Sequence, residues 1–448
     1  MYFRFSSFAF CISFIIFFFC LLFPVHGRWH NHAKKHKQHS HHHDDHYFTI
    51  SQPPSTSPSP ASPPGDDDDN GGSSSSINST GIFDVRHFGA IGDGTTDDTA
   101  AFKMAWDTAC QRDDNDNDYD YDYAIILVPY GFSFMIQSTI FTGPCKNDIV
   151  FQVDGSLIAP DGPDAWPKSY SAHQWLVFYR VYNMSLRGNG LIDGRGQKWW
   201  DLPCKPHKAI RFFMSSNLTV EGLRVKDSPQ FHFRFDNCKD VYIDSLHITA
   251  PALSPNTDGI HIENTNGVQI FNSVVANVFH LSIGSLGKHN SRACVSNITV
   301  RDSIIKVSDN GVRIKTWQGG YGAVRGVSFN NINIDNVRNP IIIDQFYCLN
   351  KGCLNQTSAV LVSDITYIDI KGTYDIRSRP MHFGCSDSMP CMNLTLANIE
   401  LFPSKGEILL DPFCWNAYGN LQTLTIPPVA CLLESSSRSF LESEKDYC

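Results

Sequence analysis

Short runs of alternating apolar and polar residues recur along the chain, and each follows a polar turn residue. Clear examples are Asp-Ile-Val-Phe at 148–151, Asn-Leu-Thr-Val at 217–220 and Asn-Leu-Thr-Leu at 393–396. Nine such phrases follow one another, and their last residues are 23 to 38 positions apart. Val, Ile and Thr favour strands, whereas Asn, Asp and Gly favour the turns between them. The pattern therefore predicts short strands in a stacked repeat of about 25–30 residues.

Among stacked architectures, the composition of the phrases favours a parallel β-helix. Leucine-rich repeats would show a regular leucine ladder, and propeller blades would be longer, whereas this chain uses isoleucine, valine and asparagine. We expect an all-β, right-handed parallel β-helix, a single solenoid whose neighbouring coils bury a shared core. Asp97, Asp98 and Thr99 precede an amphipathic segment at 100–106. This predicts a short capped helix over the N-terminal end of the solenoid.

The start of the chain has the features of an export signal. Arg4 precedes an apolar run at 8–23, and Gly27 offers a small residue for cleavage, which predicts a signal peptide at 1–27. An uncleaved anchor is the alternative, although the run is shorter than the roughly 20 residues that a membrane helix needs. No later apolar stretch is long enough to span a membrane. We expect a secreted protein of the extracellular space or cell wall, with no membrane attachment after cleavage.

Composition separates the solenoid from its flanking segments. Residues 28–81 are rich in His, Pro, Ser and Asp, which predicts a disordered tail. Eight of the 18 histidines lie at 30–46, where metal binding, an acid-dependent charge and plain solvation are the competing interpretations. Solvation is favoured because nothing there fixes a ligand geometry, and the acidic stretch at 113–122 is expected to be a surface loop. The β-helix is expected at 82–432 and a C-terminal tail at 433–448.

Charge and cysteine content narrow the possible environments. The chain of 448 residues carries 36 basic and 45 acidic residues, a net charge of −9, which excludes nucleic-acid binding through bulk positive charge. An acidic ligand would need a local basic site. Of 14 cysteines, Cys11 and Cys20 fall in the signal peptide; the other 12 allow six disulfides, whose pairing the spacing does not reveal.

Glycosylation sequons also fit a secreted protein, although turn chemistry in a repeated coil explains any single one equally well. The six sequons are at Asn78, Asn183, Asn217, Asn297, Asn355 and Asn393.

The residues best suited to chemistry lie in the middle coils. An Asn-Thr-Asp sequence within 254–260 ends in the carboxylate of Asp258. Arg313 and Lys315 are two apart on a predicted strand, so their side chains point to one face. A guanidinium fork beside an ammonium suits a carboxylated ligand, although a single Arg/Lys pair is also common on a solvated face. The two coils together are more specific than either alone.

With these coils, several motifs resemble the polygalacturonases, glycoside hydrolases that cut pectin, and the plant type in particular. The resemblance covers about 81–425 and includes Gly-Ala-Ile-Gly-Asp-Gly at 89–94, Gly-Leu-Ile-Asp-Gly-Arg-Gly at 190–196 and Ser-Ile-Gly-Ser-Leu-Gly at 282–287. It implies a right-handed parallel β-helix and hydrolysis of α-1,4-galacturonan with inversion at the sugar carbon. We expect a monomer with pectin as its partner and with no nucleic acid, metal or cofactor.

The resemblance also implies roles for individual residues. Asp258 matches an aspartate that activates water, and Arg313 and Lys315 match the pair that binds galacturonate carboxylates. Tyr347 matches the family tyrosine less closely. His280 stands one residue closer to the Ser-Ile-Gly phrase than the family histidine does. Asp258 and His280 are therefore the catalytic candidates, and Arg313, Lys315 and Tyr347 the substrate-binding ones.

One coil of the family pattern is missing. The family carries Gly-Asp-Asp-Cys and Gly-His-Gly motifs before the Ser-Ile-Gly phrase, whereas no aspartate lies between Asp258 and Asp302 here. A solenoid can lose one rung because each coil contacts only its neighbours. The loss removes the general acid, whose contribution is typically about 10²–10⁴-fold. We therefore expect a folded protein with weak or no hydrolytic activity.

Several alternatives stay open on the sequence. Beside a weak hydrolase, the chain could be a non-catalytic pectin-binding β-helix, or a mispredicted or splice form of an active polygalacturonase that contains the missing coil. A rhamnogalacturonan hydrolase or a pectate lyase is a further possibility. A lyase would need calcium-ligating carboxylates, and the Asn-Thr-Asp coil with Arg-x-Lys argues against it.

Overall fold

The computed structural model describes most of the region predicted to fold. It covers residues 81–112, 123–166, 174–202, 210–251, 254–276, 281–348, 353 and 355–434. All of them belong to the second of two units of the chain, residues 74–448. The predicted signal peptide at 1–27, the tail up to residue 80, the acidic stretch at 113–122 and His280 lie outside the described residues.

One face of the fold is a sheet of ten short parallel strands, called here the ten-stranded sheet. Each strand pairs with the next in the order β5, β8, β11, β14, β17, β20, β22, β24, β26, β28. The strands are β5 (Thr139–Thr142), β8 (Leu176–Tyr179), β11 (Ile210–Phe213), β14 (Phe233–Asp236), β17 (Ile260–Glu263), β20 (Leu281–Leu286), β22 (Asn310–Trp317), β24 (Asn339–Tyr347), β26 (Met381–Gly384) and β28 (Phe413–Trp415).

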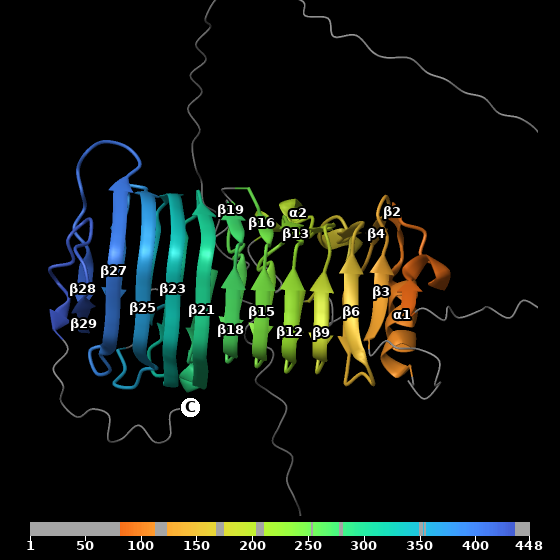
Figure 1. Ribbon diagram of the computed structural model, residues 1–448, viewed down its shortest axis with the longest axis horizontal. Coiled ribbons are helices and arrows are strands. Elements are labelled where there is room, and N and C mark those ends of the chain that lie inside the picture. Colours follow the sequence, from red (N-terminus) through yellow and green to blue (C-terminus); the bar gives the residue numbers. More distant parts are fainter. Residues whose placement is uncertain are drawn as a thin grey trace, which may run out of the picture. The chain divides into compact units, whose positions relative to one another are not determined.

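The remaining twenty strands form two columns that merge into one sheet. The long column, whose strands lie side by side in Figure 1, comprises β1 (Ile82–Asp84), β3 (Tyr123–Val128), β6 (Asp148–Val153), β9 (Tyr182–Arg187), β12 (Ser216–Glu221), β15 (Lys239–Asp244), β18 (Asn266–Phe271), β21 (Arg292–Lys306), β23 (Tyr321–Val337), β25 (Leu361–Tyr374), β27 (Cys391–Pro403), β29 (Ala417–Leu421) and β30 (Leu433–Glu434). The short column comprises β2 (Asp93–Asp97), β4 (Ser133–Met135), β7 (Ser156–Ile158), β10 (Leu191–Asp193), β13 (Arg224–Lys226), β16 (His247–Thr249) and β19 (Val274–Ala276). Strand β21 pairs with both β18 and β19, and so joins the columns.

This arrangement confirms the predicted right-handed parallel β-helix, a single solenoid. All nine sequence phrases are strands of the long column. Eight of their turn residues have positive φ, for example Asn183 at 52° and Gly267 at 70°. Asn217 donates from Nδ2 to Oδ1 of Asn183 in the coil before it, at 2.8 Å. The turn residues therefore bend each coil at one corner and bond along the stack.

Inward-facing side chains form one continuous core. In the ten-stranded sheet, Phe141, Phe178, Phe212 and Phe235 stand in register on successive strands. Phe212 stacks on Phe178 with ring centroids 5.0 Å apart, and on Phe235 at 5.2 Å. Isoleucines and Phe383 continue the same column towards the C-terminal end. Burial of this column supplies much of the hydrophobic stabilisation of the stack.

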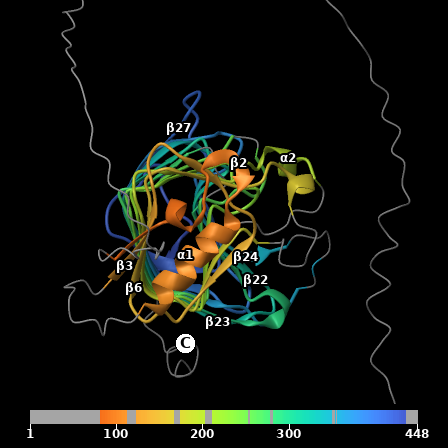
Figure 2. The same ribbon diagram turned by 90° about the vertical axis from the view of Figure 1, so that its right-hand side faces the viewer.

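Helix α1 (Thr99–Gln111) closes the N-terminal end, as predicted (Figure 2). Its buried face includes Phe102 and Trp106, and the indole of Trp106 donates to the carbonyl of Thr142 at 3.2 Å. Of the residues predicted at its start, Asp98 stands at the N-cap without a capping hydrogen bond, whereas Asp97 accepts from the backbone N–H of Thr99 at 3.1 Å. The Asp98 carboxylate instead accepts from the backbone N–H of Ile91 at 2.7 Å.

The other helices are short. They are α2 (Gln197–Trp200) and the 3₁₀ segments Val85–Phe88, Pro163–Ala165 and Lys288–Asn290. Among the described residues, no helix has the length and apolar character that crossing a membrane requires.

The strands on either side of residues 277–280 pair directly. Ile260 and Ile262 of β17 stand in register with Leu281 and Ile283 of β20. The long column is also continuous here, because β18 pairs with β21. The stack is thus continuous from β17 to β20, where the sequence predicts a missing coil.

Disulfides hold the loops and ends of the solenoid. The described pairs are Cys110–Cys145, Cys348–Cys353, Cys385–Cys391 and Cys414–Cys431, and Cys294 is also disulfide-bonded. Cys238 is a buried free thiol. The six disulfides that 12 cysteines would allow are therefore not all formed.

The aromatic column generates a stability prediction. Phe212→Ala removes a fully buried ring that contacts two others, and we expect the free energy of unfolding to fall by about 3–5 kcal/mol. Urea unfolding followed by circular dichroism measures the loss. The control Phe402→Ala, at a residue that is 45% exposed, should change stability by no more than about 0.5 kcal/mol. Equal effects of the two changes would contradict a column-based core.

Candidate active site on the ten-stranded sheet

The outer face of the ten-stranded sheet presents its side chains in rows. Successive side chains on a strand point to opposite faces, so Val312 and Ile314 of β22 are buried inside while Arg313 and Lys315 face outward. The strands are in register, so Arg313 follows Ser282 of β20, which follows His261 of β17. The row brings together residues that are about fifty positions apart in the sequence.

Asp258 sits just before β17, with 2% of its surface exposed. His232 holds its loop: the backbone N–H of His232 donates to the Asp258 carbonyl at 2.8 Å, and ring Nδ1 lies 3.1 Å from the same oxygen. Burial lowers the pKa of His232 to about 4, so this imidazole is neutral. Asn256 has a left-handed φ of 59°, so the chain turns two residues before Asp258.

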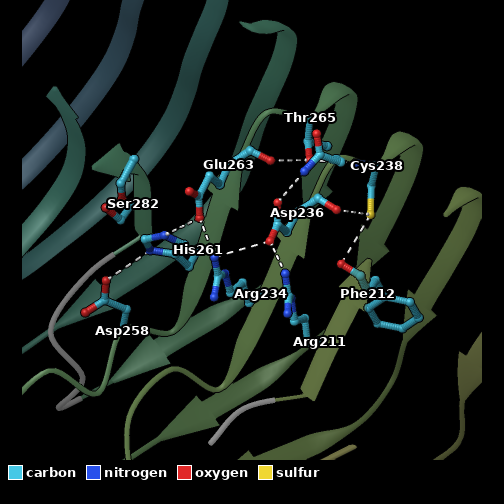
Figure 3. Close-up of polar contacts among 12 residues, drawn as sticks. Arg211, Phe212, Arg234, Asp236, Cys238, Asp258, His261, Glu263, Thr265 and Ser282 are labelled. Atoms are coloured by element: carbon cyan, nitrogen blue, oxygen red, sulfur yellow. Dashed lines mark hydrogen bonds and ion pairs between the residues drawn. The ribbon is translucent and has the colours of Figure 1, made fainter. Parts of the chain in front are cut away.

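An imidazole lies between two carboxylates (Figure 3). His261 Nδ1 is 3.5 Å from Asp258 Oδ2, and Nε2 is 3.8 Å from Glu263 Oε2. The ring of Phe231 stacks on His261 with centroids 4.3 Å apart and planes 11° apart. The stacking fixes the plane of the imidazole, and so directs its two nitrogens at the two acids.

The chain of alternating charge continues away from Asp258. Arg234 donates to Glu263 at 2.7 Å and also lies 3.2 Å from Asp236, which pairs with Arg211 (Figure 3). Burial alone would raise the pKa of Glu263, but the nearby His261 ring and the charge and hydrogen bond of Arg234 outweigh it and lower the pKa to about 2. Glu263 is therefore ionised and cannot serve as a protonated acid.

On the other side of Asp258 lies the predicted pair of cations. Lys315 Nζ is 3.8 Å from Asp258 Oδ2, and Arg313 donates to Asp344 at 3.3 Å. The ring centroid of Tyr347 is 5.4 Å from the Arg313 guanidinium and 5.2 Å from Lys315 Nζ. Burial lowers the pKa of Lys315, and Asp258 opposes this shift. Burial also raises the pKa of Tyr347, so the phenol stays neutral.

The structure therefore brings four of the five predicted site residues into one cluster, namely Asp258, Arg313, Lys315 and Tyr347. The fifth, His280, lies outside the described residues. The sequence reading missed His261 and Glu263 on one side of Asp258. The sequence did indicate where they lie. His261 and Glu263 alternate with Ile260 and Ile262, and this alternation places both polar side chains on the outer face.

Asp344 was missed on the other side of the cluster, although it lies three residues before Tyr347. Among the described residues, no group of three or more His, Cys, Asp or Glu side chains is arranged to hold a metal ion.

Comparison with known proteins identifies the family. The model of glycosyl hydrolases family 28 matches residues 121–278 and 279–410. A probable polygalacturonase of Arabidopsis thaliana is 40% identical over 394 residues, covering 81% of this chain and 86% of that protein. Polygalacturonase-2 of Solanum lycopersicum is 36% identical over 397 residues, covering 81% of this chain and 84% of that protein. The chain therefore belongs to glycosyl hydrolases family 28, and the predicted resemblance to polygalacturonases is confirmed.

Solved structures agree with the fold. The endo-xylogalacturonan hydrolase of Aspergillus tubingensis has a TM-score of 0.58 at 21% identity, covering 80% of this chain and 99% of that one. The polygalacturonase of Erwinia carotovora has a TM-score of 0.54 at 20% identity, covering 73% and 94%. At these identities the likeness establishes the fold alone.

The depressed pKa of Glu263 generates a pH prediction. Its stabilising effect is present above the unfolded value near 4.5 and is lost as the pH falls towards 2. We expect Glu263→Gln to lower the free energy of unfolding by about 2 kcal/mol at pH 6, and the deficit to shrink as the pH falls to 3. Urea unfolding at each pH measures it.

Glu407→Gln, at an exposed glutamate, is the matched control for the removal of one charge. It should show no deficit that depends on pH in this way. A Glu263→Gln deficit of constant size between pH 6 and 3 would contradict the ion pairing of Glu263.

Proposed function

We propose that this polygalacturonase-like hydrolase recognises α-1,4-galacturonan on the outer face of the ten-stranded sheet. Arg313 is the principal contact for a uronate carboxylate, with Tyr347 packing beside it. Lys315 is shared between the substrate and Asp258. The observation that carries the proposal is the cluster of one guanidinium, one ammonium and one phenol next to Asp258. A carboxylated polymer is a ligand that matches this local positive charge on an otherwise acidic protein.

We also propose that hydrolysis is weak or absent in this chain. An inverting glycosidase needs a protonated acid and a second carboxylate about 6.5–9.5 Å apart. Glu263 is ionised in contact with Arg234 and His261, and Asp344 accepts from Arg313 and from the backbone N–H of Phe346. Neither of these carboxylates is suited to protonate a leaving oxygen. Asp258 would then activate water with neither of these carboxylates as the proton donor.

The pattern of the family match supports this proposal. The match falls in two segments that meet between residues 278 and 279. The 81% of this chain aligned with the Arabidopsis relative is about 363 of 448 residues, which is about 31 fewer than the 394 aligned positions. The relative thus has about one coil of positions with no counterpart here.

Secretion to the cell wall as a monomer belongs to the same proposal. The described disulfides support it, because disulfides persist in oxidising compartments.

The role of Arg313 leads to a binding prediction. Arg313→Ala removes the charge-assisted hydrogen bonds to the uronate, so we expect the Kd for polygalacturonate to rise about 10- to 100-fold. Isothermal titration calorimetry at low salt measures it, and the wild-type affinity should itself fall as salt is raised.

Arg301→Ala is the matched control, because Arg301 is 56% exposed on β21 of the other sheet. It removes the same charge from a different face and should leave the Kd unchanged. Unchanged binding by Arg313→Ala would overturn the assignment of Arg313.

Activity provides the second test. We expect reducing-sugar release from polygalacturonate at least about 10²-fold below that of an intact family member assayed in parallel, because general acid catalysis alone contributes that much. Insertion, between residues 277 and 282, of the segment that aligns there in an intact family member should restore release. Comparable release by the unaltered chain would refute weak hydrolysis.

Sequencing the mature transcript across the same residues would show whether the protein is also made with the coil.

A further inference from the structure

The outer face of the ten-stranded sheet changes character towards its C-terminal end. The charged stretch ends at Asp344 on β24. The next two strands present His382, Phe413 and Trp415, and Phe413 stands in register with His382. The end of the face that follows the uronate site is therefore aromatic rather than ionic.

Trp415 is exposed but held in a fixed orientation. It is 52% exposed, and its indole N–H donates to Asp387 Oδ1 at 2.7 Å. Beside it, the rings of Phe413 and His382 stack with centroids 4.7 Å apart and planes 22° apart. An isolated exposed aromatic residue is ordinary on a protein surface. An indole that is oriented by a carboxylate and lies next to a stacked aromatic pair is held in place before a ligand binds.

A glycine makes this surface continuous with the uronate site. Gly384 of β26 stands in register with Asp344 on one side and Trp415 on the other. The His382 imidazole lies over Gly384, since a Cβ there would be 2.8 Å from its Nε2. The row therefore runs from Asp344 through the His382 ring to Trp415 without a projecting side chain at 384.

The charged groups at this end are poorly suited to binding the carboxylate of a uronate. Burial lowers the pKa of His382, while Asp344 opposes the shift. Arg379 is the cation nearby, and it donates to the carbonyl of Asp411 at 3.0 Å. Asp387 adds a further acidic side chain here, and its Oδ1 already accepts from the Trp415 indole. What this end offers a sugar is therefore an aromatic face.

We propose that Trp415, with the Phe413–His382 pair, is a stacking subsite for a pyranose ring of the polysaccharide, and that it binds the ring face independently of the carboxylate. The C–H groups on one face of a pyranose pack against the negative face of an indole. The subsite lies three strand steps from Arg313, roughly 14 Å at a spacing of about 4.8 Å per step. It therefore accepts a methyl-esterified or neutral unit of a chain whose acidic unit is held at Arg313. This inference rests on the proposed function.

The experiment compares two ligands and three variants by isothermal titration calorimetry on the full chain. The ligands are a long oligogalacturonate and its partly methyl-esterified counterpart. Trp415→Ala should weaken binding of both by a similar factor, roughly three- to tenfold, while Trp415→Phe should retain most of the affinity. Tyr130→Ala is the matched control: Tyr130 is 86% exposed and lies beyond β3 of the other sheet, so its loss should change nothing.

Ligand length supplies a second measurement. Digalacturonate is too short to reach from Arg313 to Trp415, so its binding should be unaffected by Trp415→Ala. An effect confined to the unesterified ligand, an equal effect on digalacturonate, or no effect at all on the long ligands would each overturn the stacking subsite. If Arg313→Ala still weakens the long ligands in that case, the proposed function stands and only the subsite fails. If neither change matters, the proposed function fails as well.

Discussion

Hydrogen bonding between in-register parallel strands is the constraint on which the rest of this molecule depends. In the ten-stranded sheet, Phe212, Ile262 and Ile314 occupy one inward column because each strand is aligned residue for residue with the next. Alternation along each strand then assigns every neighbouring residue to the outer face. Because successive strands are only about 4.8 Å apart, outward charges are within reach of each other. Arg211 stands directly beside Arg234, and Asp236 beside Glu263. These like charges are accommodated because each arginine pairs with the acid two residues along the next strand.

The same constraint separates folding from chemistry at residues 277–280. The inward residues of β17 and β20, the strands on either side of this segment, are alike, since Ile262 is in register with Ile283. The core column therefore has no gap there, and the stack keeps its hydrogen bonds. Outward residues differ from one coil to the next. The loss of one coil therefore removes the chemical groups that this coil carried. A solenoid can lose a catalytic acid in this way without any disturbance of its fold.

Local sequence patterns predicted those parts of the structure that depend on one coil. The turn residue and alternation of each phrase identified the strands of the long column, and motifs identified Asp258 and Arg313. His261 was missed because its importance depends on a register between coils, which alternation alone does not report. The role of Asp98 was not predictable for a similar reason: its carboxylate accepts from the backbone N–H groups of Ile91 and Gly92, in the loop before the helix, and not from the helix itself. Whether Cys238 forms a disulfide also depends on which cysteines the stack brings together.

The surroundings of Asp258 show a conflict between burial and base catalysis. A carboxylate that is 2% exposed needs partners, because an unpaired buried charge costs several kcal/mol. His261 and Lys315 meet that need from two sides. The same partners stabilise the anion, so Asp258 must give up part of that stabilisation when it takes a proton from water. In an intact two-acid site this cost is offset by protonation of the leaving oxygen on the other face of the sugar. On the proposed absence of that acid, the ion pairs of Asp258 would favour holding a uronate chain over cutting it.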